Sequence, residues 1–295
     1  MPHSKKMTAE IRHNEPMSRH TSLGIGGPAE AMAFPADTAG LSGLLYEAHV
    51  NGVPVFLLGN GTNLLVRDGG IKGLVINLSR MEWIAMDGGH TVRAGAGTPL
   101  PRLAGFCANE GLSGLEFATG IPGTVGGALY MNAGAYGLEI KDVLSKLTLV
   151  MEDGTVSEIT PDALEKGYRH GGLPAGAAVA EARFVLTPGD AGEIRRRASD
   201  YMDKRRATQP LSAKSAGSTF KNPPGMKAWK LIEESGLKGT SVGGAAVSEK
   251  HANFLVNAGG ATASDFIALM ELVKKTVQEK TGVTLDPEVR IVGVE

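Results

Sequence analysis

The sequence predicts an α+β fold made of about two domains. Short apolar runs typical of strands outnumber the helical segments, and the two kinds do not alternate as they do in a repeating βαβ sheet. The chain of 295 residues has 42% apolar and 21% charged residues, an ordinary globular composition, and it is long for a single domain.

Apolar runs bounded by glycine or proline predict the strands. Residues 53–66, VPVFLLGNGTNLLV, indicate a buried strand, a tight turn at Gly59–Asn63 and a second strand. Within LTLVMEDGTVSEI (147–159), the Asp153-Gly154 pair between alternating apolar residues favours a β-hairpin. Further strands are expected at 73–78, 91–97, 177–186, 241–247, 252–257 and 288–294.

Apolar residues at helical spacing predict a helix at 37–51 that ends before Gly52. A basic helix begins at Glu193 and is stopped by Pro210, and its interspersed acidic residues are typical of a solvated helix face. A contact of its C-terminal end with a diphosphate is an open alternative. Other helices are expected at 100–109, 227–235 and 264–280.

The composition changes at residues 187–190, Thr-Pro-Gly-Asp, just before the basic helix. We place the domain boundary there. The predicted divisions are an N-terminal tail at 1–20, a larger domain at 21–188 and a smaller domain at 189–295.

Charge and cysteine content exclude several classes of protein. A formal net charge of −1 provides no global field for nucleic acid or an anionic membrane. The lone Cys107 is expected to be buried and inert in a helix, and a chain that cannot form an internal disulfide favours a reducing compartment. No apolar run suggests a signal peptide or a membrane span. We therefore expect a cytoplasmic location without nucleic-acid partners or membrane insertion, and the sequence does not indicate an oligomeric state.

The segment Gly120–Gly137, GIPGTVGGALYMNAGAYG, combines six glycines with large apolar residues. This mixture is too apolar for a flexible linker, and glycine lets a backbone approach another rigid body closely. We therefore expect an extended, ordered surface against which a flat or polyanionic ligand lies.

Common phosphate, metal and acyl-transfer motifs are missing. The glycine clusters at 24–29 and 59–64 are poor Rossmann candidates, because the first follows no buried strand and the second has Leu64 in place of the third glycine. There is no Gly-Lys dipeptide for a P-loop, no histidine pair at zinc-ligand spacing and no GxSxG elbow. No metal site is expected.

The loop GNGTN (59–63) offers a different anion site. Consecutive backbone N–H groups can converge on a phosphate as a nest, and the side chains of Thr62 and Asn63 can add donors. The glycine-rich segment, sixty residues further on, could provide another wall for the same ligand. The alternative is that the loop is only a hairpin turn.

Seven motifs occur in order along nearly the whole chain: HTSLGIGGPAE (20–30), GNGTNLLVRD (59–68), GLEFATGIPGTVGGALYMNAGAYG (114–137), YR (168–169), AGSTFKNP (216–223), HANFLVN (251–257) and PEVRIVG (287–293). Together they resemble the UDP-N-acetylenolpyruvoylglucosamine reductase family. The resemblance implies a two-subdomain FAD-binding domain of the vanillyl-alcohol-oxidase type, followed by an α+β substrate-binding domain.

The resemblance also implies the ligands: FAD, NADPH as hydride donor, and the enolpyruvyl ether of UDP-N-acetylglucosamine as substrate. We expect non-covalent FAD, since no histidine lies within 59–68. The implied FAD-binding residues are Gly59, Asn60, Gly61, Thr62, Asn63, Thr119, Gly120, Ile121, Gly123, Thr124, Gly126, Gly127, Asn132 and Gly134.

Three catalytic residues carry over by motif: Arg169, Ser218 and Glu288. In the implied reaction, reduced flavin adds hydride to the methylene carbon of the substrate, which leaves negative charge on the α-carbon and its carboxylate. Arg169 can pair with that carboxylate, protonated Glu288 can hydrogen-bond it, and Ser218 can protonate the α-carbon as general acid. The implied substrate-binding residues are Tyr168, Lys221 and Asn222.

Each catalytic residue has a purely structural alternative. Ser218 could cap a turn, Arg169 could form a surface ion pair, and Glu288 could be a solvated residue at the start of a strand. Two other functions stay open: a flavin oxidase or dehydrogenase acting on another alcohol, and a nucleotide-sugar-binding protein without catalysis.

Two departures from the family pattern stand out near Arg169. Few residues separate it from the next strand, which resembles the shorter enzyme type that lacks a substrate-covering tyrosine loop. Gly171-Gly172 also stands where a small polar residue such as serine is expected.

Overall fold

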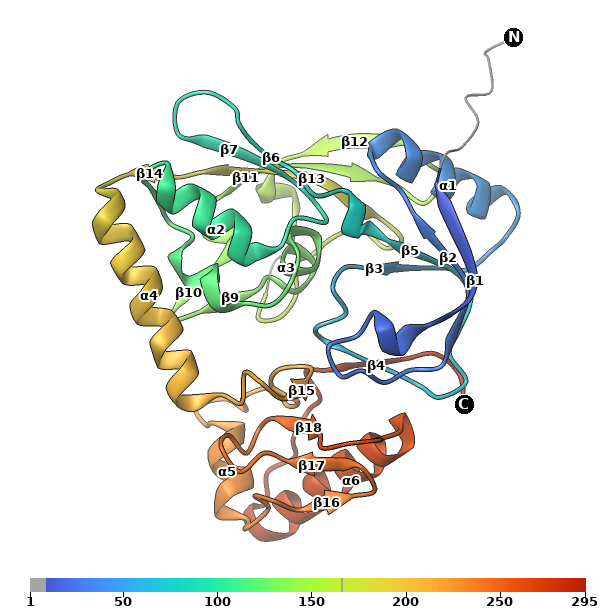
Figure 1. Cartoon of the computed structure of the whole chain (residues 1–295), viewed down its shortest axis with the longest axis vertical. Helices are drawn as coiled ribbons and strands as arrows, with labels where there is room; N and C mark the ends of the chain where they lie inside the picture. Colours follow the sequence, from blue (N-terminus) through green and yellow to red (C-terminus); the bar gives the residue numbers. More distant parts are fainter. Residues whose placement is uncertain (1–8, 166) are drawn as a thin grey trace. The chain divides into compact units, whose positions relative to one another are not determined.

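The computed structural model describes residues 9–165 and 167–295, and it forms two compact units (Figure 1). Unit 1 contains the described residues up to His13, Ala31–Asn60 and Gly73–Asp203. Unit 2 contains Asn14–Glu30, Gly61–Lys72 and Lys204–Glu295. The units interleave in sequence, unlike the continuous domains expected from composition; those domain ranges stay a prediction.

A four-stranded sheet has the order β1-β2-β5-β3. Its strands are β1 (Glu10–Pro16), β2 (Pro28–Phe34), β5 (Ile71–Asn77) and β3 (Val55–Leu58). The limits between the two units fall inside β1, β2 and β5. A short 3-10 helix, η1 (Met17–Arg19), follows β1, so residues 10–19 are regular structure and the expectation of a tail up to residue 20 is wrong there.

Unit 1 is built on an antiparallel sheet of order β12-β11-β13-β7-β6 (Figure 1). Its strands are β6 (Ile84–Met86), β7 (Thr91–Gly95), β11 (Leu144–Val150), β12 (Val156–Ile159) and β13 (Ala178–Val185). Helix α3 packs against β7 and β13, and α1 packs against β11. The helices are α1 (Thr38–Val50), α2 (Leu100–Asn109), α3 (Val125–Met131) and the part of α4 (Ala191–Thr208) up to Asp203.

Smaller elements complete unit 1. Short pairs join β9 (Gly134–Ala135) to β10 (Leu138–Glu139) and β8 (Leu112–Ser113) to β14 (Thr187–Pro188). Four 3-10 helices are η2 (Leu78–Arg80), η3 (Glu116–Gly120), η4 (Ile140–Asp142) and η5 (Pro161–Ala163). The core includes fully buried Leu103, Phe117, Leu147 and Phe184, which join helices to the sheet.

Unit 2 contains a second antiparallel sheet of order β15-β18-β17-β16. Its elements are β15 (Lys214–Ser215), α5 (Ala228–Glu234), β16 (Ser241–Val242), β17 (Ala245–Val247), β18 (Leu255–Asn257) and α6 (Ala263–Thr281). Helix α6 packs against β16, β17 and α5. A parallel pair, β4 (Leu64–Val66) with β19 (Arg290–Val292), brings the last strand beside the segment that follows GNGTN.

Most of the predicted elements are confirmed. The helix α2 has the expected bounds, and the Asp153-Gly154 turn joins β11 to β12 with Gly154 at φ 82°. Cys107 is 1% exposed, and burial raises the pKa of its thiol to about 12, so the expectation of a buried thiol is confirmed. No helix within the described ranges is both long and apolar enough to cross a membrane.

Glu116 is a buried carboxylate in unit 1 that anchors the basic helix α4. It is 6% exposed and accepts hydrogen bonds from Arg197 Nη2 (2.7 Å), Ser113 Oγ (2.8 Å) and the backbone N–H of Gly114 (2.7 Å). Burial alone would raise its pKa, but the Arg197, Gly114 and Ser113 hydrogen bonds outweigh that effect and hold the pKa below the ordinary 4.5.

The Glu116→Gln variant is expected to lose about 1–3 kcal/mol of stability at neutral pH, because Arg197 loses its charged partner. Because the folded-state pKa is depressed, this contribution is present above the unfolded value near 4.5 and is lost as the pH falls through the folded value. Calorimetric Tm values at a series of pH values check this. The gap between wild type and variant should close in acid, and a gap that is constant with pH would contradict the assignment.

Candidate active site

The GNGTN loop does not close a hairpin. Strand β3, before it, pairs in parallel with β5, whereas β4, after it, pairs in parallel with β19. The two strands that flank the loop therefore belong to different sheets, and the interpretation of the loop as only a hairpin turn is wrong. The limit between the two units falls between Asn60 and Gly61.

In unit 1, the start of this loop lies against the glycine-rich segment. A Cβ atom on Gly59 would stand 2.5 Å from Thr124 Oγ1, so a side chain at position 59 has no space. Thr124 is 1% exposed and caps α3, where its Oγ1 accepts from Gly127 N at 3.4 Å. Two segments expected to bind one cofactor, sixty residues apart in sequence, thus meet in space.

We expected the glycine-rich segment to be extended, and this expectation is wrong, because the segment contains helix α3. The residue that ends this helix, Asn132, has φ 44°, and the chain then turns back in the β9–β10 hairpin. The glycine at 126 meets protein rather than open space, since its Cβ would stand 3.2 Å from Ala96 Cβ. Sequence reasoning ascribed all these glycines to a ligand, and close packing within unit 1 explains at least this one.

The remaining implied FAD residues lie in loops, in the 3-10 helix η3 and in the short strand β9. Thr119 and Gly120 belong to η3, Ile121 and Gly123 follow it, and Gly134 lies in β9. Asn60 is exposed, and Thr62 is half-buried. Their contact with a cofactor stays a prediction.

Within unit 2, Asn63 connects the GNGTN loop to the backbone of Glu288. Its side-chain amide donates to the Glu288 carbonyl oxygen at 3.1 Å, and its own carbonyl oxygen accepts from Arg290 N at 3.0 Å. Gly61 belongs to the same unit, where its carbonyl oxygen accepts from Ser22 N. The amide of Asn63 is therefore used to hold the chain at Glu288.

Ser218 and Glu288 lie on neighbouring segments of unit 2. The backbone N–H of Glu288 donates to the Thr219 carbonyl oxygen at 2.8 Å, and Phe220 forms a β-bridge with Pro287. Both Ser218 and Glu288 are half-buried, which leaves part of each side chain accessible. The structure thus brings together two of the three predicted catalytic residues, seventy positions apart.

Asn253 is a site-supporting residue that sequence reasoning missed. It is 3% exposed, its Oδ1 accepts from Phe220 N at 2.9 Å, and its Nδ2 donates to the Phe220 carbonyl oxygen at 2.8 Å. Its carbonyl oxygen also accepts from Thr219 N. The sequence could have indicated this role, because Asn253 lies inside the apolar run HANFLVN and a buried amide needs hydrogen-bond partners.

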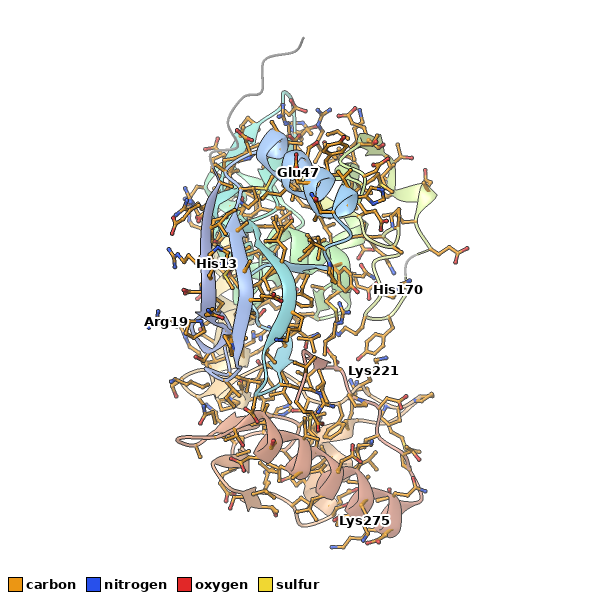
Figure 2. The ribbon with its side chains drawn as sticks, turned by 90° about the vertical axis from the view of Figure 1, so that its right-hand side faces the viewer. His13, Arg19, Glu47, His170, Lys221 and Lys275 are labelled. Carbon is orange, nitrogen blue, oxygen red and sulfur yellow. The ribbon has the colours of Figure 1, made fainter. Side chains whose placement is uncertain are left out.

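Arg169 lies in unit 1, in a tight turn of its own. The backbones of Gly167 and His170 exchange hydrogen bonds of 2.8 and 3.1 Å, which leaves Tyr168 and Arg169 at the tip. Arg169 has φ 57°, an uncommon value for a residue with a side chain, and its guanidinium lies 5.1 Å from the Tyr168 ring centroid. His170 is exposed (Figure 2), as is Tyr168.

The Gly171-Gly172 departure has a steric cause. A Cβ at Gly171 would stand 1.9 Å from the Leu129 carbonyl oxygen, at the end of α3. A serine there would push the turn away from the helix, so glycine fits this chain's packing.

The two remaining implied substrate residues differ in their surroundings. The side chain of Lys221 is exposed (Figure 2). Asn222 accepts from Ala228 N at 3.0 Å through its Oδ1 and so supports the start of α5. A substrate contact of either residue stays a prediction.

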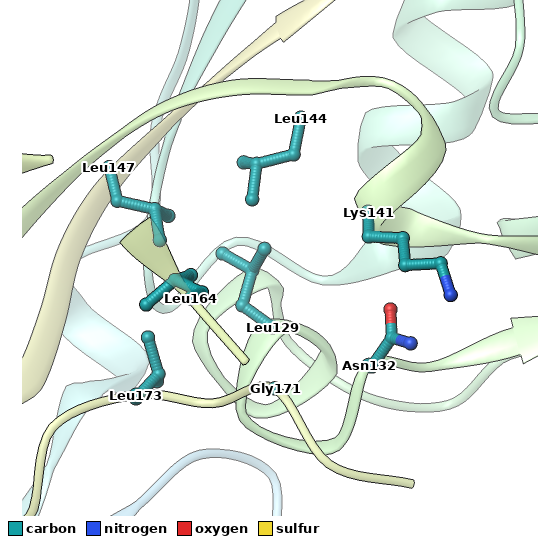
Figure 3. Close-up of a pocket in the computed structure, with 8 residues that line it drawn as sticks. All are labelled: Leu129, Asn132, Lys141, Leu144, Leu147, Leu164, Gly171 and Leu173. Atoms are coloured by element: carbon teal, nitrogen blue, oxygen red, sulfur yellow. The ribbon is translucent and has the colours of Figure 1, made fainter. Parts of the chain in front are cut away.

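A small cavity lies between α3 and the strand β11 in unit 1 (Figure 3). It is lined mainly by leucines, with Asn132 and Lys141 at one end, and its volume of about 10 Å³ is close to that of one water molecule. It is too small for a nucleotide or flavin. The described part of the chain holds no cluster of His, Cys, Asp and Glu side chains that could bind a metal ion.

The comparisons with known proteins define the class of protein first. Residues 29–160 match a family model described as an FAD binding domain, and residues 209–292 match one described as UDP-N-acetylenolpyruvoylglucosamine reductase, C-terminal domain. The chain is thus a flavoprotein with an FAD-binding domain and a second α+β domain, as the sequence predicts.

Full-length relatives give the family. The chain is 48% identical to the UDP-N-acetylenolpyruvoylglucosamine reductase of Geobacter metallireducens over 98% of this chain and 96% of that protein. It is 50% identical to the reductase of the same name from Pelobacter propionicus, over 96% and 95% of the two chains. A crystal structure of the Thermus caldophilus reductase matches with a TM-score of 0.83 and 38% identity, covering 96% of this chain and 98% of that one. The chain belongs to the UDP-N-acetylenolpyruvoylglucosamine reductase family.

Proposed function

We propose that this chain is an FAD-containing, NADPH-dependent oxidoreductase that reduces the enolpyruvyl ether of UDP-N-acetylglucosamine to UDP-N-acetylmuramate, a step of peptidoglycan precursor synthesis. The observation that carries the proposal is the 48% identity to a named reductase over 98% of the chain. Retention of Arg169, Ser218 and Glu288 supports the catalytic rather than a purely binding function.

The FAD-binding part of the proposal fits the structure of unit 1. The close approach of Gly59 to Thr124 joins the two glycine-rich segments that the family resemblance assigns to FAD. Backbone N–H groups of glycine-rich loops suit a diphosphate in general, and those of Gly123 and Gly126 here already donate to carbonyl oxygens within unit 1. Bound FAD would supply the redox chemistry by passing reducing equivalents from NADPH to the substrate. The two loops would then hold the cofactor, and the contact of Gly59 with the buried Thr124 would keep these loops together.

The chain's own residues would bind the substrate, stabilise the negative charge that develops on it and supply a proton. The guanidinium of Arg169 would pair with the substrate carboxylate. This ion pair would strengthen as negative charge develops on the carboxylate. Glu288, if protonated, would donate a hydrogen bond to the same group. Ser218, beside Glu288 through the paired backbones, would give its hydroxyl proton to the α-carbon.

Two finer predictions accompany this function. The chain is expected to act in the cytoplasm and to belong to the enzyme type without a tyrosine lid. Tyr168, which is 52% exposed beside Arg169, is expected to contact the substrate.

Steady-state NADPH oxidation by the purified, FAD-loaded protein tests the proposed function. Oxidation is expected to require the enolpyruvyl ether and to be slow with oxygen alone. Rapid oxidation with oxygen alone would favour an oxidase instead. A colourless protein that cannot be reconstituted with FAD would support a binding protein and overturn the proposal.

A further inference from the structure

Asn132 joins the end of α3 to the turn that carries Arg169. Its Nδ2 donates to the Gly167 carbonyl oxygen at 3.1 Å and to Glu139 Oε2 at 3.1 Å. Both acceptors are oxygens, so the amide orientation is set by its partners. The residue is 1% exposed, and its two amide hydrogens are both used within unit 1.

The same turn is held against α3 by its backbone. Gly171 N donates to the Tyr130 carbonyl oxygen at 2.9 Å, and Gly171 packs so closely against the Leu129 carbonyl oxygen that a side chain would not fit. Asn132 holds one end of the turn and Gly171 the other, with Arg169 between them at φ 57°. A residue in a sparsely populated conformation persists only where its surroundings impose it.

We infer that Asn132 is a positioning residue for Arg169, an inference that rests on the proposed function. The side chain acts on the substrate-binding guanidinium through Gly167 rather than on the cofactor directly. Asn132 ends helix α3, which belongs to the segment expected to bind FAD. This segment therefore also determines where Arg169 binds the substrate carboxylate. Neither ligand has to contact Asn132 for this coupling.

The test is a double-mutant cycle of Asn132→Gly and Arg169→Ala, measured as kcat/KM for the enolpyruvyl ether. Glycine preserves the positive φ of the helix end and removes only the amide. Asn132→Gly alone is expected to lower kcat/KM roughly 10- to 100-fold, as a displaced binding group does. In the Arg169→Ala background, Asn132→Gly should lower kcat/KM by less than a further factor of about two, because the guanidinium that Asn132 positions is gone.

A matched control is Asn51→Gly, since Asn51 is the C-cap residue of another helix of unit 1, α1, and its side chain donates to the Glu47 carbonyl oxygen of that same helix. Its effect on kcat/KM should be small and independent of Arg169. If Asn132→Gly does not fold, Asn132→Asp keeps the shape of the side chain, removes both amide hydrogens and is expected to give the same non-additive result.

Multiplicative effects of Asn132→Gly and Arg169→Ala would overturn the inference, as would a variant whose only defect is loss of FAD. Failure of the proposed function itself is a different result, because wild-type protein would then show no NADPH oxidation that depends on the enolpyruvyl ether.

Discussion

Replacing Ser218 by alanine is expected to leave the reduction of bound FAD by NADPH in place and to slow reoxidation by the enolpyruvyl ether at least about 100-fold. Only the second half-reaction needs a proton at the α-carbon. The hydroxyl is a weak acid, so its action depends on close placement beside the developing enolate. The backbone pairing of Thr219 with Glu288 gives Ser218 a fixed position for this role.

Anaerobic stopped-flow absorbance separates the two half-reactions. The matched control is Ser215→Ala, three residues earlier. Ser215 contacts the neighbouring segments through its backbone, which this substitution leaves in place. It should reoxidise at nearly the wild-type rate. Normal turnover by Ser218→Ala would remove Ser218 from the mechanism, and equal slowing of both half-reactions would indicate damage to the fold or the flavin site instead.

Replacing Arg169 by alanine is expected to raise the KM for the enolpyruvyl ether and to lower kcat, with a combined loss in kcat/KM of about 100-fold or more. A charged, bidentate partner of a carboxylate contributes in the ground state and more strongly as charge develops. Arg169→Lys should recover only part of this, since an ammonium group lacks the planar fork. The KM for NADPH should change much less.

Steady-state kinetics with each substrate varied in turn check this prediction. The matched control is Arg195→Ala, which removes an exposed arginine of unit 1 from the basic helix α4. A kcat/KM for Arg169→Ala within a few-fold of that of the control would show that Arg169 does not bind the substrate carboxylate.

The regular elements could be predicted from sequence because they depend on local patterns. The hairpin of β11 and β12 follows from Asp153-Gly154, and α6 follows from apolar spacing with Thr262 and Asp265 as a capping box. The segment around α3 was mispredicted as extended because its glycines suggested backbone exposure to a ligand. Gly126 is explained instead by packing against Ala96, a contact between positions thirty residues apart.

The arrangement of the site depends on pairings that no local pattern reveals. The parallel pairing of β4 with β19 places Asn63 beside Glu288 across more than two hundred residues. The bonds of Asn253 to Phe220 and of Asn132 to Gly167 likewise use amides whose partners are backbone atoms of distant loops. Motif resemblance pointed to Arg169, Ser218 and Glu288 and assigned Asn63 and Asn132 to FAD. It did not indicate the backbone contacts of these two asparagines, nor any role for Asn253.

The most direct test of the account is one anaerobic experiment on the wild-type protein. Its FAD is first reduced with one equivalent of NADPH, and the enolpyruvyl ether of UDP-N-acetylglucosamine is then added without oxygen. We predict that the oxidised flavin absorbance returns as a product appears whose mass exceeds that of the substrate by a hydride and a proton. A flavin that stays reduced until oxygen is admitted, with the substrate unchanged, would contradict the account.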